Sequence, residues 1–231
     1  MENLDKGLLS LGFIIPLVLL LILFGLAFYF KKENRKLSYY LNHYPYETFE
    51  MEEKGKSTIL RLMASLYALS YFIFPLILLL ASVEAGTNVT VYLVFALVMS
   101  ILGEGLLSLS YFIPLSQTKF HFYTLVFGQV ISSVPNICYG LLLLTWGRNA
   151  VINQAVGMGL GLFLIILSLL PILIFFLPGI REWNHMEVQS EKDGTTSLKR
   201  PDKITLAIYE NILPFINLFL LLLSYVCFLF I

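Results

Sequence analysis

The sequence predicts an all-α membrane protein, built as a bundle of six transmembrane helices. Of the 231 residues, 58% are hydrophobic, above the roughly 45–50% of soluble domains, and they gather into six long runs. Charged residues make up only 13%, and 15 basic side chains balance 15 acidic ones, so we expect no nucleic acid as a partner. The partner that this composition predicts is the lipid bilayer.

The length of each apolar run indicates a helix that crosses the bilayer. A hydrocarbon core of about 30 Å requires about 20 residues at a rise of about 1.5 Å each. Backbone groups cannot stay unpaired in lipid, and long runs without strand alternation exclude a barrel. We expect one transmembrane domain over residues 1–231, with spans at about 8–30, 59–83, 89–113, 120–145, 155–177 and 206–231.

The basic residues predict the orientation, because lysine and arginine near span ends are retained on the cytoplasmic side. All of them except Lys6 and Arg148 fall on one side, mostly in the loops at 31–58 and 178–205. These loops should therefore be cytoplasmic, and both termini extracytoplasmic. The basic cluster of the first span follows its apolar run, as in a retained anchor rather than a cleaved signal. The predicted location is the cell membrane.

Prolines and glycines should modify the spans. We expect kinks where a proline interrupts helical hydrogen bonding, at Pro75, Pro135, Pro171 and Pro214. In the fifth span, Gly157 and Gly161 are spaced to let another helix approach closely. Between the last two spans, residues 187–202 are mostly small, polar or charged with almost no apolar residues, and we expect them to be mobile.

Polar residues inside the spans are the main functional signal, because each costs free energy unless it faces protein or water. In the third span they recur at helical spacing on one face, as Ser100, Glu104, Ser108 and Tyr111. The fourth span has a second stripe of Gln129, Ser132, Ser133, Asn136 and Gly140. The sixth has a third, made of Glu210, Pro214, Asn217 and Ser224.

Depth in the membrane predicts which of these residues meet. Residues 114–119 join the third and fourth spans as a tight hairpin, and Glu104 and Gln129 each lie about 15 Å from it along their helices. Asn217 enters from the same side to a similar depth. We expect a cluster of Glu104, Gln129 and Asn217 with Asn136 farther out. Further contributors to this cluster would be Ser100, Ser108, Ser132, Ser133 and Glu210.

Two interpretations of Glu104 remain open. A lone carboxylate at this depth is costly unless a cation or water reaches it, and we expect no membrane-embedded lysine or arginine as its partner. The carboxyl group is then either a proton or cation site, or a neutral acid that holds helices together by hydrogen bonding. The sequence does not separate these two roles.

A short element in the first cytoplasmic loop resembles a known family. Pro45-Tyr46-Glu47 is similar to the Pro-Tyr/Phe-Glu element of the small chain-A subunit of respiratory NADH:quinone oxidoreductase. The glycine that follows it in that family is absent, and Pro75 and Ile77 stand near the places of the family's acidic pair. This chain also has three further spans. We assign no family on three matched residues.

Two classes of function fit the sequence. One is a small transport protein, either a permease or an ion or proton pathway around Glu104. The other is an accessory or structural subunit whose partners are other membrane subunits. No enzyme, metal or cofactor is predicted, because the sequence lacks a Gly-x-Ser-x-Gly turn and its histidines, His43, His121 and His185, are scattered. Cys138 and Cys227 should act as small apolar side chains.

Overall fold

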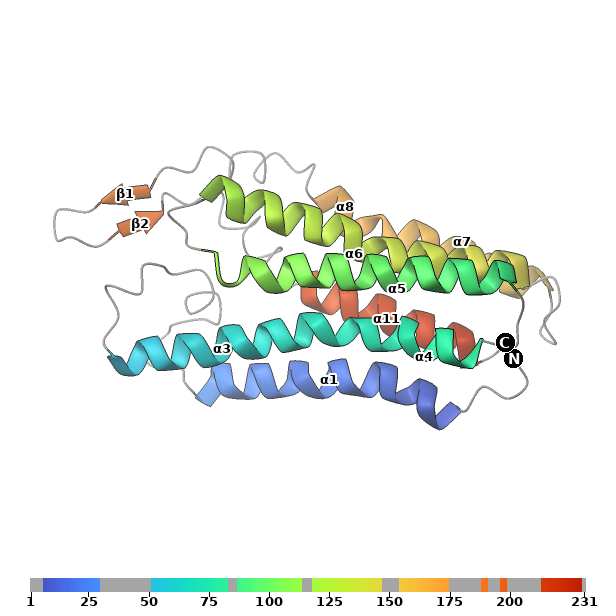
Figure 1. The fold of residues 1–231 in the computed structure, drawn as a ribbon, viewed down its shortest axis with the longest axis horizontal. Coiled ribbons are helices and arrows are strands. Elements are labelled where there is room, and N and C mark those ends of the chain that lie inside the picture. Colours follow the sequence, from blue (N-terminus) through green and yellow to red (C-terminus); the bar gives the residue numbers. More distant parts are fainter. Residues whose placement is uncertain are drawn as a thin grey trace.

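The computed structural model describes residues 6–29, 51–82, 87–113, 118–146, 154–174, 188–190, 196–198 and 213–229. Apart from two short strands, these residues form helices and the turns that end them (Figure 1). Several predictions lie outside the described residues: those on Glu210, His43, His185, most of the two loops expected to be cytoplasmic, and the Pro45-Tyr46-Glu47 element.

Helices form where the sequence is apolar. Their bounds are α1 (Lys6–Tyr29), α3 (Met51–Leu69), α4 (Ile73–Ala81), α5 (Thr87–Ser110), α6 (Thr118–Trp146), α7 (Gln154–Ser168), α8 (Leu170–Ile174) and α11 (Leu213–Leu229). Five stretches are long and apolar enough to cross a membrane: Gly7–Leu26, Thr58–Ala81, Val89–Ser110, Tyr123–Thr145 and Val156–Leu173. The sixth, Ile216–Leu229, is shorter within the described part of α11. The expected helical bundle is therefore present, with five helices of spanning length.

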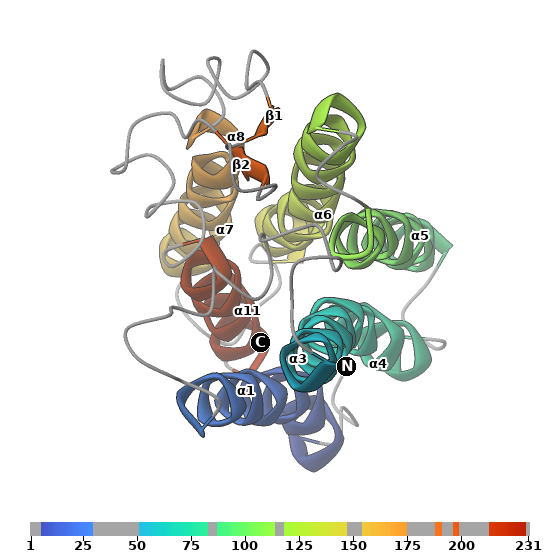
Figure 2. The same cartoon turned by 90° about the vertical axis from the view of Figure 1, so that its left-hand side faces the viewer.

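The helices form a closed ring in the order of the sequence (Figure 2). Going around the ring, α1 packs against α3 and α4, these against α5, then α6, α7 and α11, and α11 returns to α1. The helix α11 also contacts α6. Because successive helices alternate in direction, the start of α1 and the end of α11 lie at the same end of the bundle (Figure 1).

A proline divides the second helix of the ring. Proline has no N–H, and its ring clashes with the carbonyl four residues earlier, which for Pro75 is that of Tyr71. One turn of 3-10 helix, η1 (Ser70–Phe72), accordingly joins α3 to α4. The predicted irregularity at Pro171 is also present, since α7 ends at Ser168 and α8 begins at Leu170. The helix α6 continues through Pro135.

Glycines allow the closest helix contacts. A Cβ atom on Gly103 of α5 would lie 2.5 Å from the backbone nitrogen of Ser132 in α6. Cβ atoms on Gly140 and Gly161 would each lie 2.7 Å from the other residue's carbonyl oxygen, so α6 and α7 also touch through their backbones. The predicted close approach in the fifth span is thus made by Gly161, whereas nothing lies within 4 Å of a Cβ on Gly159.

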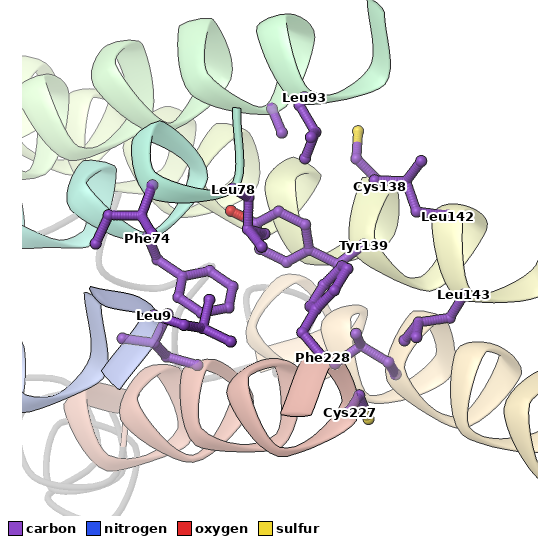
Figure 3. Close-up of a cluster of buried hydrophobic side chains, with 14 of the residues drawn as sticks. Leu9, Phe74, Leu78, Leu93, Cys138, Tyr139, Leu142, Leu143, Cys227 and Phe228 are labelled. Carbon is purple, nitrogen blue, oxygen red and sulfur yellow. The ribbon is translucent and has the colours of Figure 1, made fainter. Parts of the chain in front are cut away.

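The largest apolar core lies toward the end where α1 begins (Figure 3). There the rings of Phe74, Tyr139 and Phe228 pack edge to face, with centroid separations of 5.4 to 6.2 Å. Outward-facing surfaces are also apolar, as at Leu21 of α1 and Val91 of α5, which are 62% and 66% exposed. Such surfaces are compatible with a protein embedded in a membrane.

Two strands pair in the segment that we expected to be mobile. Val188–Ser190 (β1) and Thr196–Leu198 (β2) form an antiparallel pair in which Val188 faces Leu198. The sequence analysis did not predict this pair, although Val188 and Thr196 favour extended backbone.

Candidate functional site

Glu104 lies buried on α5, with only 6% of its surface exposed. Its carboxyl group has no hydrogen bond or ion pair with any residue that the structure describes. Ser100, one turn away on the same face, is 2% exposed and likewise has no hydrogen bond to the described residues. Buried polar groups almost always have a hydrogen-bond partner. A buried carboxyl group without one among the described residues therefore needs an explanation other than helix packing, such as a functional role.

Four tyrosines lie in the neighbourhood of this carboxyl. The hydroxyl groups of Tyr67, Tyr71, Tyr111 and Tyr139 all lie within electrostatic range of Glu104. Those of Tyr67 and Tyr71 are hydrogen-bonded to each other at 2.5 Å, and either can donate. Tyr139 reaches in from α6 and is 2% exposed. The site thus joins one acid to four hydroxyl groups from three parts of the ring.

The local sequence explains how these groups come together. The helices α3 and α5 are antiparallel and are joined by a hydrogen bond between the hydroxyls of Ser65 and Ser108. One turn beyond Ser108 on α5 is Glu104, and the matching turn of α3 is Tyr67 to η1. Because Pro75 imposes the tight turn there, Tyr71 stays beside Tyr67 and next to the acid.

A buried arginine lies near the site. Arg61 belongs to the apolar stretch Thr58–Ala81 and is 2% exposed. Its Nη1 donates a hydrogen bond of 3.1 Å to the carbonyl of Tyr111, just past the end of α5. A cation suits the negative end of a helix dipole. Tyr111 is about 10 Å along the helix from Glu104, so Arg61 is a neighbour of the site and not its ion-pair partner.

The two predicted amides bind each other. Gln129 Nε2 donates to Asn217 Oδ1 at 3.0 Å, and Asn217 Nδ2 donates to Gln129 Oε1 at 3.3 Å. One heptad farther along both helices, Ser224 Oγ donates to Asn136 Oδ1 at 3.4 Å. These pairs join α6 to α11 at a constant register. Gln129 is 1% exposed, so the bond is shielded from solvent.

The structure does not bring Glu104 into hydrogen-bond contact with either amide. Gly103 faces α6 closely, so the next residue, Glu104, turns toward α3 and η1 instead. Ser132 and Ser133 both donate to the backbone carbonyl of Gln129, within their own helix. The predicted cluster therefore separates into an acid with tyrosines and a pair of amides.

Sequence reasoning missed the second helix of the site. Its signal was present, because Arg61 and Ser65, and then Tyr67 and Tyr71, are each spaced by four residues and so share helix faces. Arg61 is one of the basic residues that predict the orientation, and the tyrosines lie within apolar runs. Tyr139 gave no such pattern.

The fold is a bundle whose long apolar helices are compatible with a membrane protein, and its buried acid, Glu104, has no hydrogen bond or ion pair with the described residues. Among the described residues there is no group of three or more His, Cys, Asp and Glu side chains that could hold a metal ion. Comparison with family models, curated proteins and solved structures finds no match to this chain.

Proposed function

We propose that this chain is a multi-pass protein of the cell membrane with a transport role, in which Glu104 is a proton or cation site. The supporting observation is the Glu104 carboxyl, which is 6% exposed, has no hydrogen bond to the described residues and lies within electrostatic range of four tyrosine hydroxyls. Ionisable groups inside membrane spans are costly, and they commonly mark ion pathways and proton relays. The proposal is for a non-enzymatic protein.

The alternative role of Glu104, as an acid that holds helices together, is less well supported. Such an acid would donate a hydrogen bond to a neighbouring helix. In this bundle, other pairs make the interhelical hydrogen bonds: Gln129 with Asn217, Ser65 with Ser108, and Ser224 with Asn136. Glu104 makes none with the described residues.

The orientation of the bundle is part of the proposal. The distribution of lysine and arginine favours a cytoplasmic location for the end of the bundle near Arg61. The end where α1 begins and α11 ends would then be extracytoplasmic. Accessibility of single introduced cysteines from either side of intact cells tests this assignment.

A role as an accessory subunit is the second candidate. The outward face of α1 is apolar over its whole length, from Leu8 at 42% exposed to Phe28 at 79%. This face suits lipid, but it equally suits another membrane subunit. Purification in mild detergent followed by identification of copurifying chains separates the two: a stable hetero-complex favours the accessory role.

The test of the transport role is ion flux in liposomes. Purified protein is reconstituted with a pH-sensitive dye or a cation indicator inside, and wild type is compared with Glu104→Gln. We expect the substitution to abolish the flux. Ser168→Ala is a matched control, since Ser168 is fully buried but bonds only to its own helix, at the carbonyl of Leu164. Unchanged flux in Glu104→Gln would refute the proposal.

A further inference from the structure

The two sides of Glu104 differ in polarity. Toward the Arg61 end, the interface between α3 and α5 carries hydroxyl groups at successive levels. The tyrosine pair comes first, then the Ser65 and Ser108 pair, and finally Arg61 at the Tyr111 carbonyl. In both hydroxyl pairs either oxygen can donate. A polar line therefore runs from the acid to one end of the bundle.

The other side of Glu104 is closed by apolar packing. Beyond Ser100, the next inward-facing residues of α5 are Ala96 and Leu93, and both are fully buried. They belong to the core in which Phe74 of α4, Tyr139 of α6 and Phe228 of α11 pack edge to face (Figure 3). Polar groups on this side include Ser100, the hydroxyl of Tyr139 and the pair of Asn136 with Ser224, which are hydrogen-bonded to each other. A dense apolar layer of this kind excludes water and ions.

We propose that in this conformation protons reach Glu104 only from the Arg61 end, through the hydroxyl-lined interface of α3 and α5, and that the apolar core bars the opposite side. This inference rests on the proposed transport role of Glu104, and it names both the species and the side of access. Release to the other side would require the core around Phe74 and Tyr139 to open.

The chemistry of the path favours the proton over a metal cation. A hydroxyl group accepts a proton on its oxygen as it gives up its own, so each step forms one O–H bond and breaks another; water bridges the levels between the pairs. At the end of the path the Glu104 carboxylate gains the O–H bond. The positive charge of Arg61 repels a proton and a metal cation alike, so the preference rests on the exchange of O–H bonds, which a metal cation cannot undergo.

The groups that face Glu104 support this assignment. They are Tyr67 and Tyr71 from α3 and η1, Tyr111 beyond the end of its own helix, and Tyr139 from α6. All four are hydroxyl groups that can both donate and accept. No second carboxyl group is among these neighbours. The site thus has one carboxylate that can accept a proton, and a set of hydroxyl groups that can pass protons to it.

Cysteine accessibility tests the side of access. Single Ser108→Cys and Ala96→Cys variants of the full chain are prepared in two sets of sealed vesicles, right-side-out and inside-out. Each set is treated with a membrane-impermeant anionic methanethiosulfonate. Tyr29→Cys marks the Arg61 end, because Tyr29 is 81% exposed at the end of α1. The native Cys138 and Cys227 are buried, so unsubstituted protein is the blank.

We expect Ser108→Cys to react only from the side marked by Tyr29→Cys, and Ala96→Cys to react from neither side. Reaction of Ser108→Cys from the opposite side, or from no side, would overturn the inference. Reaction of Ala96→Cys from the far side would do the same, because it would show that the apolar layer is open.

Proton flux in liposomes tests the path and the species. Ser65→Ala and Ser108→Ala should each slow Glu104-dependent proton flux, and the double variant should slow it no more than the stronger single one. Ser110→Ala is the matched control on α5, since Ser110 is fully buried but bonds only to the carbonyl of Leu107. Sodium or potassium flux that also depends on Glu104 would contradict the proton assignment.

These outcomes are separable from failure of the proposed function. If Glu104→Gln stops the flux while both serine variants match Ser110→Ala, the site stands and the path is wrong. If Glu104→Gln leaves the flux unchanged, the proposed function itself fails, whatever the cysteines show.

Discussion

Gln129 and Asn217 bind each other through both halves of their side-chain amides, one hydrogen bond in each direction. The pair joins α6 to α11, and it recurs one heptad later as Asn136 and Ser224 at the same register. A seven-residue repeat is the spacing at which two parallel helices keep the same faces in contact. These polar pairs therefore fix how α11 aligns with α6.

Removing one amide should destabilise the bundle more than removing both. Gln129→Leu leaves the buried amide of Asn217 unpaired, at a cost of about 1–3 kcal/mol. The double variant with Asn217→Leu should recover part of this, with a coupling energy of about 0.6–2 kcal/mol. Unfolding in mixed micelles with increasing denaturing detergent measures the stability of the wild type, the two single variants and the double variant. Additive effects of the two substitutions would contradict the pairing.

Replacing Glu104 with an apolar residue should raise the stability of the bundle. Its carboxyl makes no hydrogen bond to the described residues, so Glu104→Leu removes an unsatisfied polar group without breaking a contact. We expect the free energy of unfolding to rise by about 1–3 kcal/mol while the flux is lost, as is typical where a functional group is kept at the expense of stability. The same detergent titration measures the change. A large loss of stability would instead show that Glu104 holds helices together.

A methyl group at Gly103 should disrupt the contact between α5 and α6. The Cβ of Gly103→Ala would lie 2.5 Å from the backbone nitrogen of Ser132, so a helix must shift, at a cost of about 1–3 kcal/mol or more. Gly105→Ala is the control on the same helix, because nothing lies within 4 Å of its Cβ. It should be neutral or stabilise by about 0.5–1 kcal/mol through helix propensity. Thermal unfolding in detergent compares the two, and equal effects would refute the close packing.

A second glycine pair gives the same comparison for α6 and α7. In Gly161→Ala the new Cβ would lie 2.7 Å from the carbonyl oxygen of Gly140, whereas Gly159→Ala meets nothing within 4 Å. We expect only Gly161→Ala to lower stability, by about 1–3 kcal/mol. A disulfide between cysteines introduced across α6 and α7 would report the separation directly, by forming more slowly in that variant. Similar stability of both alanine variants would argue against this contact.

The overall bundle could be predicted because hydrophobic runs are long and unambiguous. Run length alone located all five helices of spanning length, and proline chemistry located the break before Pro75. Helical spacing also placed Gln129 and Asn217 at a common depth, and they do meet. In each case the signal is local, since it depends on residues within one helix or at equal distances from one turn.

The composition of the site could not be predicted in the same way. The spacing of polar residues along the third span correctly predicted that Glu104 is buried. It did not predict which helix Glu104 faces, because neighbouring positions on a helix point about 100° apart and a small rotation of the helix changes the partner. Gly103 determines the rotation of α5, and only the packed structure reveals that its partner is Ser132. A tyrosine has an apolar ring and a polar hydroxyl group, so a hydrophobicity count includes it among the apolar residues. For this reason the polar role of Tyr67 and Tyr139 could not be recognised within their apolar runs.

The ring is closed by a contact between helices far apart in the chain. Phe13 of α1 stacks on Tyr225 of α11, with ring centroids 5.7 Å apart and planes within 10°. Because α11 follows the other helices in the chain, the face of α1 that carries Phe13 has no such partner until α11 is made. The same holds for Gln129 and its partner Asn217. A bundle without α11 would therefore be an open arc and not a closed ring.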